Sequence, residues 1–215
     1  VDVRAGDVKL TNSSGAESTA EAGSATIQIA ATGGGNAQGN LTLGPGSIGV
    51  SGASSTTLQA TRSIVLEGQT ALAASGDLVL RSNTLTASQG ANAAMSATQR
   101  LLVDRPTGTD DSGPRAAAGA GATLLLSGDQ IVQAGTIDLP SGSLTLNAAG
   151  SVDTRPAVLF DEGSVTTLRG RSAEFDGQPV IKRRRLEHQR RARRHPARRS
   201  GADRCFRRRR GRAGR

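Results

Sequence analysis

Residues 135–150, GTIDLPSGSLTLNAAG, contain one short pattern twice. In GTIDL, Ile137 and Leu139 are separated by one polar residue, and in GSLTL, Leu144 and Leu146 are spaced in the same way. Alternation with a period of two is typical of a β-strand that buries one face. Each copy begins at a glycine, where the backbone can adopt the positive φ of a tight corner. Strands this short cannot bury a core alone, so we expect them to stack on copies of themselves.

The alternation also predicts which side chains of this segment are buried. The expected inward set is Ile137, Leu139, Leu144 and Leu146, and the expected outward set is Asp138, Thr145 and Asn147.

Similar phrases occur along most of the chain. They are GDVKL from Gly6, SATIQI from Ser24, GNLTL from Gly39, GSIGV from Gly46, RSIVLEG from Arg62, GDLVLRSN from Gly76, QRLLVD from Gln99, ATLLLSG from Ala122, GSVDT from Gly150 and GSVTTL from Gly163. Degenerate repeats of this kind predict an all-β solenoid. Three short strands and their corners take about 20 residues, so residues 1–181 would form roughly nine turns.

Charge divides the chain into two parts. The net charge is +9, but residues 182–215 hold 17 of the 27 Lys and Arg residues and 2 of the 18 Asp and Glu residues. The tail therefore carries +15, and residues 1–181 carry 10 basic and 16 acidic residues, a net charge of −6. We interpret residues 1–181 as a repeat body and residues 182–215 as a basic, disordered tail.

The composition of the body favours a narrow stack of strands over a β-sandwich. The chain has no Trp or Tyr, and the body has only Phe160 and Phe175. A sandwich core about 10 Å thick is normally filled with aromatic residues, whereas a narrow coil needs only inward Leu, Val, Ile and Ala. Weak strands are also a better interpretation than a helix for the Ala- and Ser-rich residues 91–100.

The largest expected interruption of the repeat is residues 105–122, RPTGTDDSGPRAAAGAGA. It has two prolines and no alternation, so we expect a surface loop held at both ends by aliphatic strands. Its charged residues Arg105, Asp110, Asp111 and Arg115 are the candidate partner-facing residues. Adjacent aspartates could suggest calcium, but the Gly-Gly-x-Gly-x-Asp repeat is missing, and we interpret them as a solvated turn.

The phrases GDLVLRSNTLTASQG, GTIDLPSGSLTLNAAGSVDT and GDVKLTNSSG resemble the repeats of filamentous-haemagglutinin-like adhesins, the large exoproteins of bacterial two-partner secretion. The resemblance implies a right-handed parallel β-helix, export through an outer-membrane secretion pore and a location outside the bacterial cell. It also implies attachment to a host-cell or bacterial surface receptor or glycan. The chain begins with Val1 and shows no signal-peptide pattern, so we expect an internal fragment that forms a monomeric rod.

Catalysis is not expected from the body. Both histidines and the one cysteine lie in the tail, so the body lacks Ser-His, Cys-His and zinc-binding combinations, and we expect no catalytic residue, cofactor or metal. A β-helical polysaccharide lyase or hydrolase would need charged residues clustered on one face, and no such cluster is evident along the chain.

The tail leaves two interpretations open. An arginine-rich arm could neutralise the phosphates of nucleic acid or bind other polyanions, although aromatic residues for base stacking are lacking beyond Phe206. Alternatively, the tail is an out-of-frame translation, because arginine codons of GC-rich DNA read one nucleotide later become mostly glycine and alanine codons. We favour the second interpretation and expect no specific nucleic-acid partner.

Overall fold

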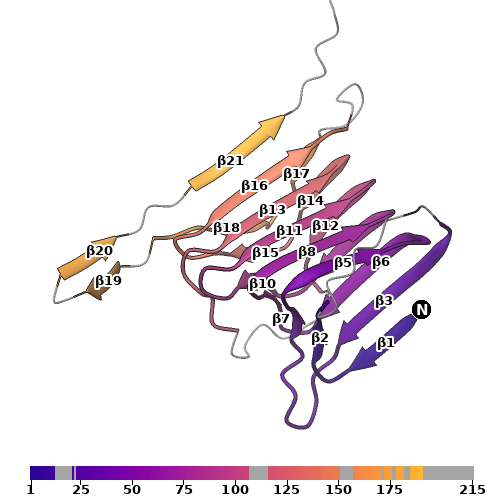
Figure 1. Ribbon diagram of the computed structural model, residues 1–215, viewed down its shortest axis with the longest axis horizontal. Helices are drawn as coiled ribbons and strands as arrows, with labels where there is room; N and C mark the ends of the chain where they lie inside the picture. The colour runs from indigo at the N-terminus through magenta and orange to yellow at the C-terminus, as the bar shows by residue number, and fades with distance from the viewer. Residues whose placement is uncertain are drawn as a thin grey trace, which may run out of the picture.

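The computed structural model describes residues 1–12, 21, 23–106, 116–150, 157–170, 172–175, 178–181 and 185–190. These residues form an all-β structure of 21 strands without a helix (Figure 1). Nineteen of the strands lie in three parallel sheets, and two form an antiparallel pair, as the strand order of the sheets shows. The predicted all-β class and the predicted stacking of short strands are therefore confirmed.

The three parallel sheets are called sheets 1, 2 and 3 below. Sheet 1 consists, in order, of β1 (Asp2–Ala5), β3 (Ala25–Ala31), β6 (Ala53–Ala60), β9 (Asp77–Arg81), β12 (Arg100–Asp104), β14 (Gln130–Gln133) and β17 (Val158–Phe160). Sheet 2 consists of β2 (Val8–Leu10), β4 (Leu41–Leu43), β7 (Ser63–Leu66), β10 (Thr84–Ala87), β15 (Thr136–Asp138) and β18 (Val165–Thr167). Sheet 3 consists of β5 (Gly46–Val50), β8 (Gln69–Ala74), β11 (Asn92–Ala97), β13 (Thr123–Gly128), β16 (Ser143–Ala148) and β21 (Arg185–Arg190).

In most turns, successive strands pass from sheet 1 to sheet 2 to sheet 3 and then back to sheet 1, and we call each such passage a layer. Among the described residues, the first layer (β1 and β2) has no strand in sheet 3, and the layer of β12 and β13 has none in sheet 2. Leu126 pairs with Leu146, 20 residues later, and Leu41 pairs with Ile64, 23 residues later. These spacings agree with the predicted repeat. Met95 pairs with Leu126, 31 residues later, because a long loop intervenes. Long loops of this kind add residues to individual turns. Among the described residues the largest sheet therefore has seven strands, fewer than the roughly nine turns expected.

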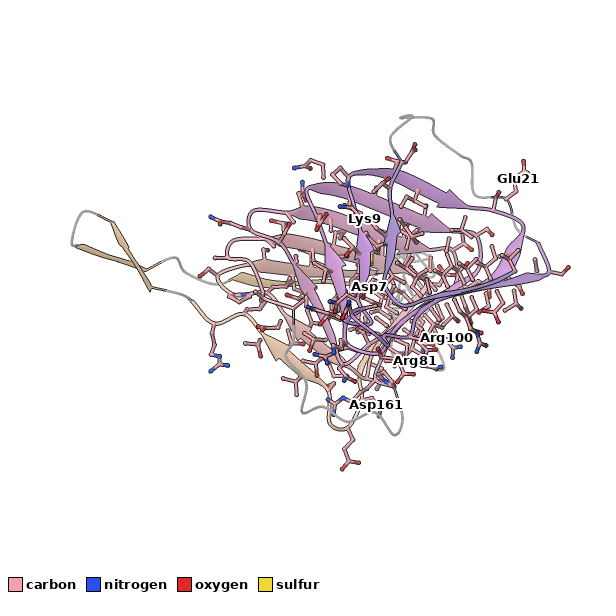
Figure 2. The ribbon with its side chains drawn as sticks, turned by 90° about the horizontal axis from the view of Figure 1, so that it is seen from below. Asp7, Lys9, Glu21, Arg81, Arg100 and Asp161 are labelled. Carbon is pink, nitrogen blue, oxygen red and sulfur yellow. The ribbon has the colours of Figure 1, made fainter. Side chains whose placement is uncertain are left out.

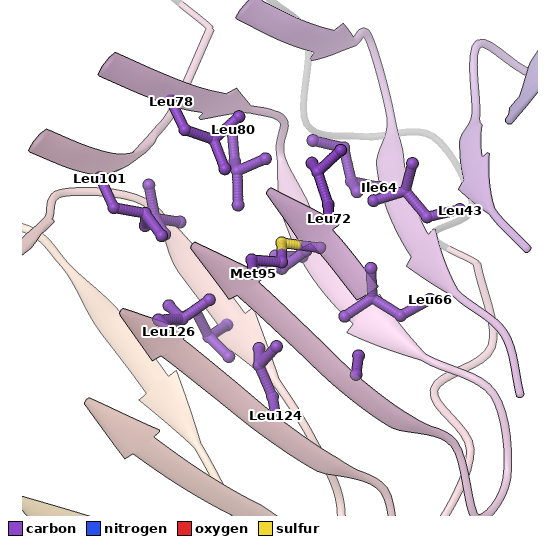
Figure 3. Packing of buried hydrophobic residues seen from close by; sticks show 14 of the residues in the cluster. Leu43, Ile64, Leu66, Leu72, Leu78, Leu80, Met95, Leu101, Leu124 and Leu126 are labelled. Carbon is purple, nitrogen blue, oxygen red and sulfur yellow. The ribbon is translucent and has the colours of Figure 1, made fainter. Parts of the chain in front are cut away.

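The core fills the space between the three sheets. Leu72, Met95 and Leu126 occupy matched positions on β8, β11 and β13, and Figure 3 shows them among the buried aliphatic side chains. A layer contributes leucine, isoleucine or alanine from each sheet, so each core side chain packs against its counterparts one strand spacing, about 4.8 Å, away. This stacking produces a continuous core from residues that are far apart in the sequence.

The predicted inward set of residues 135–150 is confirmed, because Ile137, Leu139, Leu144 and Leu146 are each 0% exposed. The outward set alternates with it as predicted, but Asp138, Thr145 and Asn147 are half-buried. Neighbouring layers lie close enough for outward side chains to cover one another in part. Residues 91–100 also follow the strand interpretation, since they contain β11.

The basic tail is described only at β21, which pairs in parallel with β16 over its whole length. Arg185–Arg190 therefore continue sheet 3 beyond the expected end of the body at residue 181. The antiparallel pair of β19 (Ser172–Phe175) and β20 (Gln178–Ile181) lies between β18 and β21 in the chain. The prediction of a disordered tail otherwise falls on residues outside the described ones.

Asp7 closes the glycine-rich corner formed by residues 33–40. Its carboxylate accepts hydrogen bonds from the backbone N–H groups of Asn40 and Gln38, at 2.8 and 3.1 Å. These bonds stabilise the charged form and hold the pKa of Asp7 below its ordinary value. An exposed carboxylate thereby connects the start of sheet 2 to the next layer.

We expect Asp7→Asn to lower the melting temperature at pH 7. A carboxylate whose folded-state pKa is lowered stabilises the protein above its unfolded-state pKa, and this contribution disappears as the pH falls through the folded value. The difference in melting temperature should therefore shrink as the pH is lowered from about 5 to 3. Asp129→Asn, at an exposed corner residue, is the matched control and should show little difference at either pH. A difference for Asp7→Asn that persists at low pH would contradict the role of its charge.

Candidate functional site

The loop of residues 105–122 occurs where sheet 2 omits a strand. The chain leaves β12 in sheet 1 and next forms β13 in sheet 3. In sheet 2, β10 pairs directly with β15 through Leu85 and Ile137, although β9 and β14 in sheet 1 are separated by β12. Among the described residues, this layer therefore adds no strand to sheet 2. The loop occurs at the point of the sequence where the other layers form their sheet-2 strand.

The returning arm of the loop, residues 116–122, is hydrogen-bonded to earlier layers. The backbone N–H of Ala116 donates to the hydroxyl of Ser63 on β7, at 3.3 Å. Further along, Gly119 donates to the carbonyl of Ala87, at 2.7 Å, and Ala120 accepts from Gly90, at 3.1 Å. The arm thus packs against sheet 2, within the segment that the sequence predicts as a surface loop.

Gly119 is the residue that allows this close approach. A Cβ atom at this position would overlap the backbone of Ser88 and Gln89, at the corner after β10. The outward residues of β10, Thr84 and Thr86, are 2% and 0% exposed, so the outer face of sheet 2 is covered at this layer. The glycine- and alanine-rich part of the loop therefore packs on sheet 2, and its small side chains allow the two backbones to approach closely.

Arg105 anchors the other end of the loop. Its side chain is exposed, and its guanidinium Nη2 donates to the Thr136 hydroxyl at 3.2 Å and to the Gly163 carbonyl at 3.1 Å. Its backbone N–H donates to the Asp104 carboxylate at 2.8 Å. Arg105 thus connects β12 to later layers. The other candidate residues, Asp110, Asp111 and Arg115, lie outside the described residues.

A second surface feature is an open groove of about 470 Å³ on sheet 3. Its lining residues are Pro45, Gly46, Ser47, Gln69, Thr70, Ala71, Asn92 and Ala94. The exposed amides of Gln69 and Asn92 lie in register on β8 and β11. Amide groups of this kind can donate and accept hydrogen bonds, so the groove suits uncharged polar groups such as hydroxyls.

The third feature is a group of four charged side chains on the outer face of sheet 1. Arg81 Nε lies 2.9 Å from Asp104 Oδ2, and Arg100 Nη2 lies 3.1 Å from Asp77 Oδ2. Each pair joins β9 to β12, one pair at the start of the two strands and the other at their end. Figure 2 labels Arg81 and Arg100, one from each pair.

Sequence reasoning missed this cluster, because the partners in each pair are 23 residues apart and come together only through the strand register. The spacing of one layer is the signal that could have identified them.

Among the described residues, no three or more His, Cys, Asp and Glu side chains come together in a way that could hold a metal ion. The described part of the chain also has no helix with the length and apolarity needed to cross a membrane. No family model, curated protein or solved structure matches the chain.

Proposed function

We propose that this chain is a non-catalytic binding segment of a filamentous-haemagglutinin-like adhesin, exposed on a bacterial surface or secreted. In this proposal the three sheets form a right-handed parallel β-helix. Two observations support it: in most layers the chain visits the three sheets in the same order, and its register spacings match the short repeated phrases. Right-handed connection is the general rule for parallel strands joined by a crossover.

The observation that carries the binding function is the replacement of a sheet-2 strand by residues 105–122. A loop at this position can vary in sequence while the layers on both sides preserve the core. Its base is held by Arg105 on one side and by residues 116–122 on the other. Residues 107–115, TGTDDSGPR, join these two anchors and carry charges of both signs together with hydroxyl groups. Such groups suit a polar receptor or a glycan.

The experiment is an attachment assay in which only residues 107–115 are replaced by a Gly-Ser segment of equal length. Arg105, Pro106 and residues 116–122 are kept, because they pack on the body and their loss would disturb it. We expect binding to host or bacterial cells at physiological salt to fall about tenfold or more. The matched control replaces residues 13–20, another long connection, and should retain binding. If the variant at residues 107–115 binds as well as the control variant at residues 13–20, the loop is not the contact with the cell surface.

The alternative function is binding of nucleic acid or another polyanion by the basic tail. It is favoured by the charge of +15 in residues 182–215. Attachment that requires the tail and disappears at high salt would support this alternative over the adhesin. Attachment by residues 1–181 that is insensitive to salt would support the loop-based proposal.

A further inference from the structure

The outer face of sheet 1 carries a row of aliphatic side chains. Val79, Leu102, Val132 and Leu159 are register partners on the adjacent strands β9, β12, β14 and β17. They alternate with inward core residues such as Leu78 and Leu101, so they point away from the core. Val79 is 9% exposed, Leu102 and Val132 are half-buried, and Leu159 is 39% exposed. The row extends about 14 Å along the stack, at the usual spacing of parallel strands.

The two ion pairs lie on opposite sides of this row. Asp77 and Arg100 precede Val79 and Leu102 by two residues, whereas Arg81 and Asp104 follow them by two. On one side the order along the stack is acidic then basic, and on the other side it is basic then acidic. The four charges therefore alternate around the aliphatic residues.

This alternating arrangement is complementary to itself. When two copies face each other about a two-fold axis parallel to the stack, each strand of sheet 1 meets the same strand of the partner copy. Asp77 then faces the partner's Arg81, and Arg100 faces the partner's Asp104. The same axis places the aliphatic row against the partner's aliphatic row along its whole length. A two-fold axis along the strands would also match the charges, but it would place Val132 and Leu159 against Thr57 and Gln28 of the partner.

We propose that the outer face of sheet 1 is a self-association surface, on which a second copy of this chain packs side by side about a two-fold axis parallel to the stack. A closed two-fold interface uses the same patch on both copies, so the patch must be complementary to itself. The outer face of sheet 1 is self-complementary in this sense. Aligned sheets pack about 10 Å apart, which leaves room for the facing Leu and Val side chains and for the charged groups at their margins. This surface does not include residues 107–115 of the proposed function, although Asp104 contributes to both regions because its carboxylate also accepts the backbone N–H of Arg105. The proposal departs from the expectation of a monomeric rod.

The test uses two charge-exchange variants of the full chain. The first combines Asp77→Arg with Arg100→Asp, and the second combines Arg81→Asp with Asp104→Arg. Each variant keeps opposite charges within its own ion pair and keeps the net charge of the chain. Each nevertheless places like charges opposite one another at all four contacts of the proposed dimer. A mixture of the two variants makes all four contacts attractive again.

Sedimentation velocity at about 50 µM protein should show a dimer for the wild type. A dimer with a micromolar dissociation constant is mostly associated at this concentration. Each variant alone should dissociate about tenfold or more readily, since facing like charges oppose association. The equimolar mixture should restore dimers, which also shows that both variants are folded. A monomeric wild type would overturn the proposal, as would a first variant that dimerises like the wild type or a mixture that stays monomeric. Larger assemblies that neither variant affects would also overturn it.

Discussion

Leu124→Asp is expected to destabilise the protein by about 4 kcal/mol or more, through loss of core packing and burial of a carboxylate without a partner. Leu124 is 0% exposed on β13 and stacks between Ala93 of the preceding layer and Leu144 of the following layer. The interior of the three sheets at this point is lined by aliphatic side chains (Figure 3). Chemical denaturation followed by circular dichroism should show a much lower midpoint or an unfolded chain.

The adjacent residue provides the matched control. Thr123 begins the same strand and is exposed, so Thr123→Asp places the same carboxylate in solvent. We expect its effect to stay within about 0.5 kcal/mol, as for most surface substitutions. Similar losses for the two variants would contradict the assignment of inward and outward faces on sheet 3.

Gly76→Ala is expected to lower stability by about 3 kcal/mol, at the upper end of the usual effect of overpacking. Gly76 lies at the corner between β8 and β9, and a Cβ atom there would overlap the backbone carbonyl of Ser54 in the preceding layer. A backbone neighbour cannot rotate away as a side chain can. The layers must separate locally, which weakens the hydrogen bonds between strands on both sides of the corner.

Gly90→Ala is the comparison for this corner effect. Gly90 has a φ of 65°, but no atom lies within 4 Å of the position that its Cβ would take. Alanine there has only the strain of the left-handed conformation, about 1 kcal/mol. Thermal melts should therefore rank Gly76→Ala as clearly more damaging than Gly90→Ala. The reverse order would show that the corners are not closely stacked.

If the proposed self-association occurs, two copies would lie side by side with their stacks parallel. The loop at residues 105–122 follows β12, one of the strands at the centre of the proposed interface. Both copies would then carry this loop in the same layer, and attachment through two loops would be stronger than through one. The first charge-exchange variant, Asp77→Arg with Arg100→Asp, provides a way to measure this contribution, because it leaves residues 107–115 and Asp104 unchanged.

The sequence by itself determined the strands that carry strong aliphatic alternation. GTIDL, GSLTL and GDLVL each specify a strand and its buried face. Alternate side chains of a strand point to opposite faces of a sheet, so apolar residues at every second position all lie on one face. It did not specify β10 or β14, TLTA and QIVQ, where threonine and glutamine dilute the pattern. These strands form because neighbouring layers supply both their hydrogen-bond partners and their apolar contacts.

Only the tertiary structure decided which distant residues meet. Register places Asp77 beside Arg100 and Arg81 beside Asp104, and it aligns the aliphatic row from Val79 to Leu159. It also places residues 116–122 of the loop against sheet 2, although these alanines and glycines have no alternation. Such contacts depend on the number of residues in each loop, which sets the alignment of one layer on the next. A local sequence pattern describes single strands, whereas the surfaces of this protein arise from the sum of strand spacings and loop lengths across its layers.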